Sequence, residues 1–156
     1  MIWYDIKKLE HKIAENRVDD KEVFNYLLIS ILTLAVIPVT VEDNGEHIWL
    51  QPAEIAVSIL TTVVGMKLTY DTNLNGDNKD YFRRFLALSF VTGIRIIAAV
   101  LAVTLSFAFI IYYFEIIIDP LTADIFYILL LLISQILYYQ QLIRSFRNVS
   151  SLQAQK

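Results

Sequence analysis

The chain has 156 residues, of which 56% are apolar and 19% are charged, and its mean hydropathy is +0.53. A soluble domain of this size has too little interior to hide so many apolar side chains. The formal net charge is -3 and the basic residues form no continuous stripe, which argues against nucleic acid as a direct partner. Cysteine is absent, which excludes disulfides, thiolate metal sites and cysteine nucleophiles.

Four stretches are long and apolar enough to cross a bilayer as helices, which takes about 20 mostly apolar residues each. Backbone amides in lipid must be satisfied within their own segment, and no alternating strands are present that could close a barrel. We therefore predict an all-α integral membrane protein, a single four-transmembrane-helix bundle over residues 1–156 with an N-terminal amphipathic arm over 1–20. The predicted spans are Val23–Val41, Pro52–Tyr70, Phe85–Phe114 and Ile125–Ile143.

The connecting segments predict the orientation, because loops rich in Lys and Arg resist translocation across the membrane. The N-terminal arm, the second connection and the C-terminal tail are basic, whereas the first connection (42–51) and the third (115–124) contain no Lys or Arg. Both termini are therefore expected on the cytoplasmic side, and we expect a bacterial inner (plasma) membrane.

The N-terminal arm has a helical apolar face formed by Ile2, Ile6, Leu9 and Ile13, at spacings of four, three and four. Such a helix can lie on the inner headgroups. It can equally pack on the bundle or on a neighbouring subunit, and the periodicity does not separate these two arrangements.

The helix starts have recognisable capping residues. Asp19 followed by Glu22 predicts a capping box before the first span. Asn78 or Asp80 is expected to cap the third span, and Thr122 the fourth.

Arg95 is the most suggestive single residue, because it lies inside the third apolar stretch and a charge within the membrane is costly. It shares a helix face with Ala99, Ala102 and Ser106, small residues of the kind found where helices pack. Gln135 of the fourth span is predicted at a similar depth and could pair with Arg95. Alternatively, Tyr81–Arg95 is an interfacial helix and the Arg95 side chain extends to lipid phosphates.

The second span has a polar stripe at helical spacing, formed by Glu54, Ser58, Thr61, Gly65 and Thr69. Such a stripe could line a path for ions, with Glu54 at its mouth. The alternative is that the small residues and hydroxyls serve the packing of helices against each other.

The connection between the second and third spans resembles the start of a calcium-binding loop, with Asp71, Asn73, Asn75 and Asp77 as oxygen ligands. The position that should hold a bidentate Glu is occupied by Phe82, so the candidate is weak. A turn that leads into a helix explains the same residues.

The middle of each span lacks Asp, Glu and His, so we expect no catalytic residues, no enzyme activity and no cofactor or metal. The first hypothesis is a structural or effector subunit that assembles in the membrane, as a homo-oligomer or with another membrane protein. The alternative is a small ion channel or solute transporter lined by the second-span stripe and Arg95. The lipid bilayer is the expected partner in both cases, and the ion or small-molecule ligand of the alternative stays open.

Overall fold

A computed structural model describes residues 1–36, 50–115 and 117–155, and these residues form five helices and no strand. The helices are α1 (Ile6–Ala14), α2 (Asp20–Val36), α3 (Leu50–Leu74), α4 (Tyr81–Tyr113) and α5 (Pro120–Ala154). The prediction of an all-α protein is confirmed for this part of the chain.

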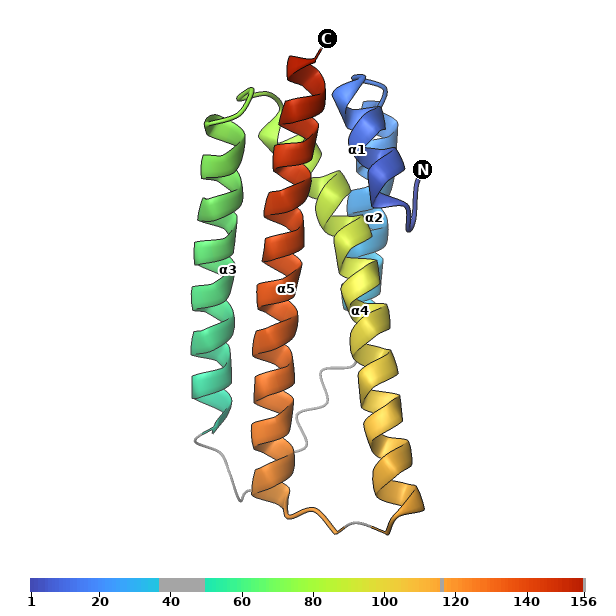
Figure 1. Ribbon diagram of the computed structural model, residues 1–156, viewed down its shortest axis with the longest axis vertical. Coiled ribbons are helices and arrows are strands. Elements are labelled where there is room, and N and C mark those ends of the chain that lie inside the picture. The colour runs from blue at the N-terminus through green and yellow to red at the C-terminus, as the bar shows by residue number, and fades with distance from the viewer. Residues whose placement is uncertain (37–49, 116, 156) are drawn as a thin grey trace.

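The helix α5 lies at the centre of the arrangement and packs against α3, α4 and α1 (Figure 1). The helix α2 packs on α4, and α1 packs across α4 and α5. The connection from α3 to α4 lies at the same end as the C-terminus, and the connection from α4 to α5 lies at the opposite end. The long helices thus form a row in the order α3, α5, α4, α2, and successive members of the series α3, α4, α5 run in opposite directions.

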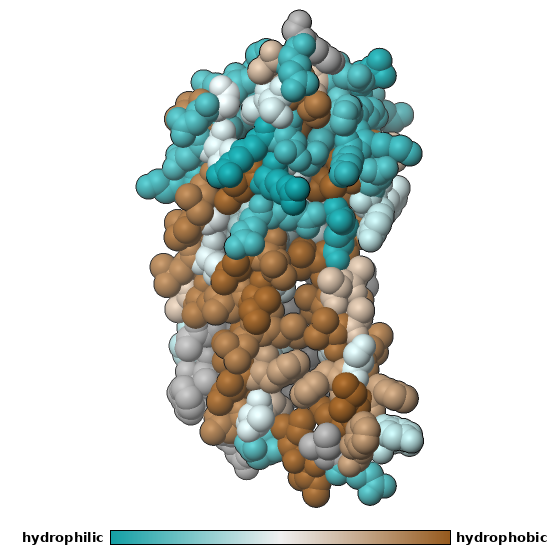
Figure 2. All heavy atoms as spheres, viewed as in Figure 1, coloured by the Kyte–Doolittle hydropathy of each residue, from teal (hydrophilic) through white to brown (hydrophobic). Residues whose placement is uncertain are grey.

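On the face seen in Figure 2, apolar side chains cover the middle of the molecule, and polar side chains cover the end that carries the C-terminus. Among the described residues, two helices are long and apolar enough to cross a membrane, Tyr81–Tyr113 and Leu121–Ala154. No residue in the most apolar window of either helix is buried. A core helix of a soluble protein would be mostly buried, so this exposure is what a membrane-embedded helix shows.

The other two predicted spans, Val23–Val41 and Pro52–Tyr70, are not supported as membrane spans among the described residues. The span predicted at Val23–Val41 continues into residues 37–41, which lie outside the described residues, and α2 is described only as far as Val36. In α3 the hydroxyl side chains and Lys67 lower the apolar character of the described part.

The helices that follow are longer than the predicted spans. The helix α4 begins at Tyr81 and not at Phe85, and α5 continues past Ile143 to Ala154. At 1.5 Å per residue the 33 residues of α4 reach about 50 Å, well beyond a hydrocarbon layer of about 30 Å. Both α4 and α5 are therefore longer than the hydrocarbon layer is thick. The turns that exceed this thickness lie among polar side chains.

The amphipathic helix α1 packs on the other helices, as one of the two predicted arrangements requires. Ile6, Leu9 and Ile13 are buried. They belong to the same apolar cluster as residues of α2, α4 and α5, namely Tyr26, Ala87, Leu88, Phe90, Val91, Leu142, Phe146 and Val149. The alternative in which α1 lies on lipid headgroups with this face is wrong.

The predicted helix caps are partly right. The carboxylate of Asp19 accepts a hydrogen bond from the backbone N–H of Glu22 at 2.7 Å, as a cap should. Asp80 is the N-cap of α4 but makes no side-chain cap bond. The fourth cap is Asp119 and not Thr122, because Asp119 precedes Pro120 and accepts from both the backbone N–H (2.9 Å) and the hydroxyl (2.7 Å) of Thr122.

The contact of α3 with α5 depends on Gly65, which is covered by the aromatic ring of Tyr139. A Cβ added at Gly65 would overlap three atoms of that ring. A Cβ added at Gly93 of α4 would meet nothing within 4 Å. Gly65 and Gly93 both lie within helices but differ in whether a side chain would fit, so alanine substitutions at the two positions can be compared directly.

Gly65→Ala is expected to lower the free energy of unfolding by about 1–3 kcal/mol, because the ring must move away. Gly93→Ala should leave it unchanged or raise it by up to about 1 kcal/mol, since alanine favours helix. Titration of the solubilised protein with a denaturing detergent, followed by circular dichroism, measures both. Equal effects of the two substitutions would contradict this packing.

Candidate functional site

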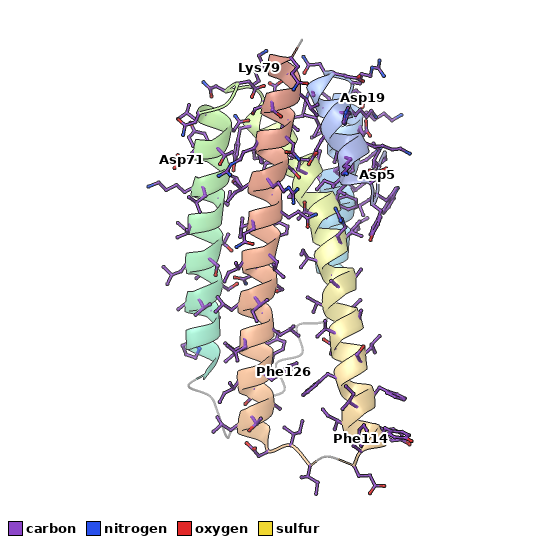
Figure 3. All side chains as sticks on the ribbon, viewed as in Figure 1. Asp5, Asp19, Asp71, Lys79, Phe114 and Phe126 are labelled. Atoms are coloured by element: carbon purple, nitrogen blue, oxygen red, sulfur yellow. The ribbon has the colours of Figure 1, made fainter. Side chains whose placement is uncertain are left out.

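Most charged side chains gather at one end of the molecule, which we call the polar cap. It consists of α1, the first turns of α2 and α4, the α3–α4 connection (75–80) and the part of α5 beyond Tyr139. Figure 3 places Asp5, Asp19, Asp71 and Lys79 in this half, and Phe114 and Phe126 toward the opposite end. The cap is where the described chain can recognise a polar ligand.

A buried arginine organises the cap on the side of α3. The Arg84 side chain is 2% exposed and makes a bidentate pair with Asp77, at 2.5 and 2.6 Å. It also donates to the amide oxygens of Asn73 and Gln153, both at 3.2 Å. Because these partners come from α3, the α3–α4 connection and the end of α5, one guanidinium joins three segments. A bidentate pair with further hydrogen bonds offsets the cost of burying the charge.

The second network joins α1 to α2 around Glu22, which is 7% exposed. Its carboxylate pairs with Lys12 and, at 3.2 Å, with the amino group of Met1. The Tyr26 hydroxyl donates to the carbonyl of Ile2 at 3.1 Å and accepts from the Ile2 N–H at 2.9 Å. The segment before α1 is thereby held against α2.

The two carboxylates have pKa values below their ordinary ones. Burial raises the pKa of Glu22, but the hydrogen bonds and charges of Lys12 and of the Met1 amino group outweigh it and lower the pKa from 4.5. Burial also raises the pKa of Asp77, and the Arg84 guanidinium outweighs it and lowers the pKa from 3.8. Both groups therefore remain charged in the folded protein at neutral pH.

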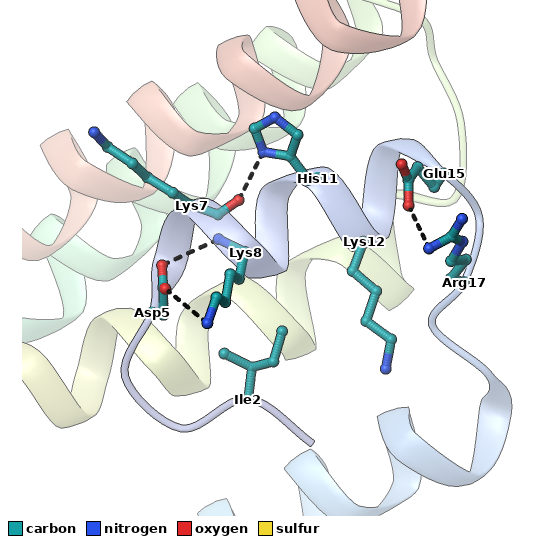
Figure 4. A pocket seen from close by; sticks show the side chains of 8 residues that line it. All are labelled: Ile2, Asp5, Lys7, Lys8, His11, Lys12, Glu15 and Arg17. Carbon is teal, nitrogen blue, oxygen red and sulfur yellow. Dashed lines mark hydrogen bonds and ion pairs between the residues drawn. The ribbon is translucent and has the colours of Figure 1, made fainter.

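The outer face of α1 is a shallow, mixed-charge surface (Figure 4). Asp5 accepts from the backbone N–H of Lys8 at 3.1 Å, and Arg17 pairs with Glu15 at 3.1 Å. The Lys7 side chain points away from Lys8 and Lys12, toward the other side of α1. That side faces α5 and a second cavity.

This second cavity, which we call the α1–α5 cavity, lies between α1, α4 and α5 and has a volume of about 570 Å³. Lys7, Arg95 and Arg144 line it together with Glu10 and Gln140. The Arg95 guanidinium carbon lies 5.5 Å from the centre of the Tyr4 ring, within cation–π distance. Arg95 thus lies beside Tyr4 at the border of the polar cap, and the extension of its side chain to lipid phosphates stays a prediction.

Gln135 has a different partner from the one predicted. Its side-chain Nε2 donates to the Ser58 hydroxyl of α3 at 2.9 Å, and its Oε1 is buried without a hydrogen bond. The predicted pairing of Gln135 with Arg95 is therefore wrong. The reason is geometric: Gln135 points to the α3 side of α5, whereas Arg95 approaches α5 from the opposite neighbour, α4.

The described part of the α3 stripe is used for packing. Ser58 contacts Gln135 and Gly65 lies beneath Tyr139, both on α5. Thr61 bonds the Val57 carbonyl of its own helix. Thr69 is buried, and its hydroxyl lies 3.0 Å from that of Tyr81. The side chain of Glu54 lies outside the described residues.

The small residues that follow Arg95 lie on an exposed part of α4. Ala99, Ala102 and Ser106 are all exposed, and the Ser106 hydroxyl donates to the carbonyl of Ala102 at 2.7 Å. The expectation that this stripe marks a helix–helix contact therefore stays a prediction, and within the described residues its three members are exposed.

The four calcium-loop residues do not form an ion-binding loop. Asp71 and Asn73 belong to the last turn of α3, whose helix continues to Leu74. Asn73 and Asp77 accept hydrogen bonds from Arg84, so a guanidinium takes the place that a cation would need. Asn75 is exposed. No group of three or more potential metal ligands occurs among the described residues.

Sequence reasoning missed the partners of Arg95. Lys7 and Glu10 are three residues apart on α1, and Arg144 lies one turn past Gln140 on α5. Helical periodicity therefore predicts that the two members of each pair share one helix face. Only the docking of α1 across α4 and α5 brings them to one cavity. Arg84 directly precedes the predicted third span, in a connection that the sequence marks only as basic, and its burial has no sequence signal.

Comparison with protein-family models, with curated proteins and with solved structures finds no match for this chain.

The depressed pKa of Asp77 predicts a pH-dependent stability. A carboxylate with a lowered folded-state pKa stabilises the fold above its unfolded pKa, near 3.8, and loses this contribution as the pH falls through the folded value. Asp77→Asn is therefore expected to lower the free energy of unfolding at pH 7 by about 1–3 kcal/mol, because Arg84 stays buried without its counter-charge. The difference from wild type should shrink below about pH 4.

Denaturation of solubilised protein between pH 7 and pH 3 measures this difference. Asp71→Asn is the control, since Asp71 has no ion pair among the described residues. An Asp77→Asn effect that is constant over this pH range would contradict the assignment of a charged pair.

Proposed function

We propose that this chain is an integral membrane protein with four transmembrane helices that acts as a subunit of a membrane assembly, with a second copy of the same chain as its partner. In this proposal the termini and the polar cap are cytoplasmic, the membrane is a bacterial inner membrane, and the chain has no catalytic role. The row of helices with an apolar exterior supports the membrane location (Figure 2).

The exposed stripe on α4 is the observation that carries the assembly. In a membrane the hydrophobic effect does not drive helices together, so close backbone approach at small residues supplies the contact. Ala99, Ala102 and Ser106 provide such a surface over about two turns, and they are exposed within the described part of the chain. Two copies can bring the same stripe together about a two-fold axis, which makes a closed dimer.

The channel alternative has less support, because its lining residues are engaged. Ser58, Gly65 and Thr69 contact α5 or α4. Arg95 lies beside Tyr4, at the border of the polar cap, and not along the stripe of α3. An ion path would need these contacts to be replaced by water.

The membrane topology is tested with tags. A tag inserted between Val41 and Trp49, and one inserted between Ile117 and Asp119, should be reached by a non-permeant reagent only from outside intact cells. A tag after Gln155 should be reached only after permeabilisation. Access to the first tag from the cytosol would contradict the four-span arrangement while leaving α4 and α5 as spans.

The assembly is tested with single cysteines, which are clean probes because the chain has none. Ala102→Cys is expected to form a disulfide-linked dimer when native membranes are oxidised. Ala108→Cys is the matched control: it is an equally exposed alanine on the same helix, six residues on and therefore turned by about 120° from the stripe. Monomeric Ala102→Cys, or equal crosslinking at both positions, would exclude a dimer through this stripe.

A further inference from the structure

The α1–α5 cavity has an excess of positive charge that the described residues leave unpaired. Lys7, Arg95 and Arg144 line it, and the lining carboxylate is Glu10. The Glu10 carboxylate is nearly buried, at 5% exposed, and accepts a hydrogen bond from Asn148 at 3.1 Å. The ion pairs formed among the described residues leave the three cations without a carboxylate partner. Three positive groups against one negative group favour an anionic ligand.

The cations of the cavity come from three different helices. Lys7 belongs to α1, Arg95 to α4 and Arg144 to α5. The guanidinium of Arg95 is held over the ring of Tyr4, which limits its motion. Guanidinium groups donate in a fixed fork that matches the oxygens of a phosphate, and an ammonium adds a point charge. The arrangement suits a phosphate ester better than a simple halide.

The cavity also reaches from the polar cap into the apolar surface. Ile96 and the half-exposed Leu137 line its apolar end, and Gln140, Arg144 and Asn148 follow along α5. Leu137 to Asn148 spans about 16 Å of helix at 1.5 Å per residue. A ligand that fills this length is polar at one end and apolar at the other. A phospholipid has this shape, whereas free phosphate would fill the polar end alone.

We propose that the α1–α5 cavity binds the phosphate headgroup of an anionic glycerophospholipid, with Arg95, Arg144 and Lys7 as its donors and the acyl chains along Ile96 and Leu137. A volume of about 570 Å³ is within the range of about 300–1,000 Å³ of small-molecule sites. This inference rests on the membrane location in the proposed function and is independent of the dimer. It gives the polar cap a specific lipid as its partner.

Lipid binding to the full chain, solubilised in a neutral detergent, is measured by native mass spectrometry with added phosphatidylglycerol or phosphatidylcholine. Phosphatidylglycerol is expected to bind at least about tenfold more tightly. Arg144→Gln should weaken phosphatidylglycerol binding by about tenfold, the value of one charge-assisted contact. The matched control is Arg147→Gln, because Arg147 is one turn further along α5, is equally exposed and does not line this cavity. It should leave the affinity unchanged within about twofold.

Arg95 provides a second and independent variant. Arg95→Gln is expected to reduce phosphatidylglycerol binding by about tenfold, and Arg95→Lys should restore most of it, since the charge returns. Circular dichroism and elution volume of each variant show that the fold is kept. If Arg144→Gln and Arg147→Gln weaken binding equally, or if both lipids bind equally, the proposed site is overturned.

Competition with inorganic phosphate tests whether the cavity binds free phosphate or the phosphate of a lipid headgroup. At 10 mM, a concentration on the order of thousands of times that of the lipid, it is expected to displace less than about half of the bound phosphatidylglycerol, because it makes no contact with the apolar end. Full displacement by phosphate would overturn the assignment to a lipid.

Extraction of native membranes with alkaline carbonate separates the failure of this inference from that of the proposed function. A chain that is extracted has no membrane location, which overturns both. A chain that remains in the membrane without preferring phosphatidylglycerol overturns the lipid site alone, and a lipid preference without crosslinking overturns the dimer alone.

Discussion

A guanidinium that is 2% exposed must find its hydrogen-bond partners within the protein, and Arg84 finds them in three separate segments. Asp77 supplies the counter-charge, and Asn73 and Gln153 complete the set. Because the last of these lies near the end of α5, the position of α5 relative to the α3–α4 connection is determined by one side chain. An arginine in this position tolerates few alternative arrangements, since each lost partner leaves a buried charge unsatisfied.

From the Arg84 cluster toward the start of α5, further contacts join α5 to its neighbouring helices. Tyr139 covers Gly65, and further along Gln135 donates to Ser58, so α3 lies along one side of α5 over most of its length. On another side, α1 inserts Ile6, Leu9 and Ile13 between α4 and α5. The helix α5 is therefore a common support for α1, α3 and α4, and α2 is joined to this group through α4 and α1.

The sequence predicts those features that depend on local pattern. Apolar length predicts helices, and the spacing of Ile6, Leu9 and Ile13 predicts the buried face of α1. Asp19 is a cap because its side chain is short and precedes a helix. These features need no knowledge of which helices are neighbours.

What the sequence does not predict are contacts between distant segments. Arg95 and Gln135 are at comparable depth by helical rise, yet Arg95 lies on α4 whereas Gln135 of α5 faces α3, so the two side chains do not meet. The hydroxyl stripe of α3 has the same spacing whether it faces water or another helix, and the ring of Tyr139 decides between them. The α1–α5 cavity needs three helices to be placed before it exists at all.

The helices α4 and α5 are joined near both of their ends. Phe107 stacks on Phe126 with ring centres 4.2 Å apart, close to the turn between the helices, and Arg84 bonds Gln153 at the other end. Two connections so far apart resist shearing of one helix along the other and scissoring about a central pivot. The α4–α5 hairpin is therefore a rigid frame to which α3 is also joined, at Gln135 and Tyr139 of α5. Among the described long helices, α2 is the one whose displacement would break the fewest of these contacts.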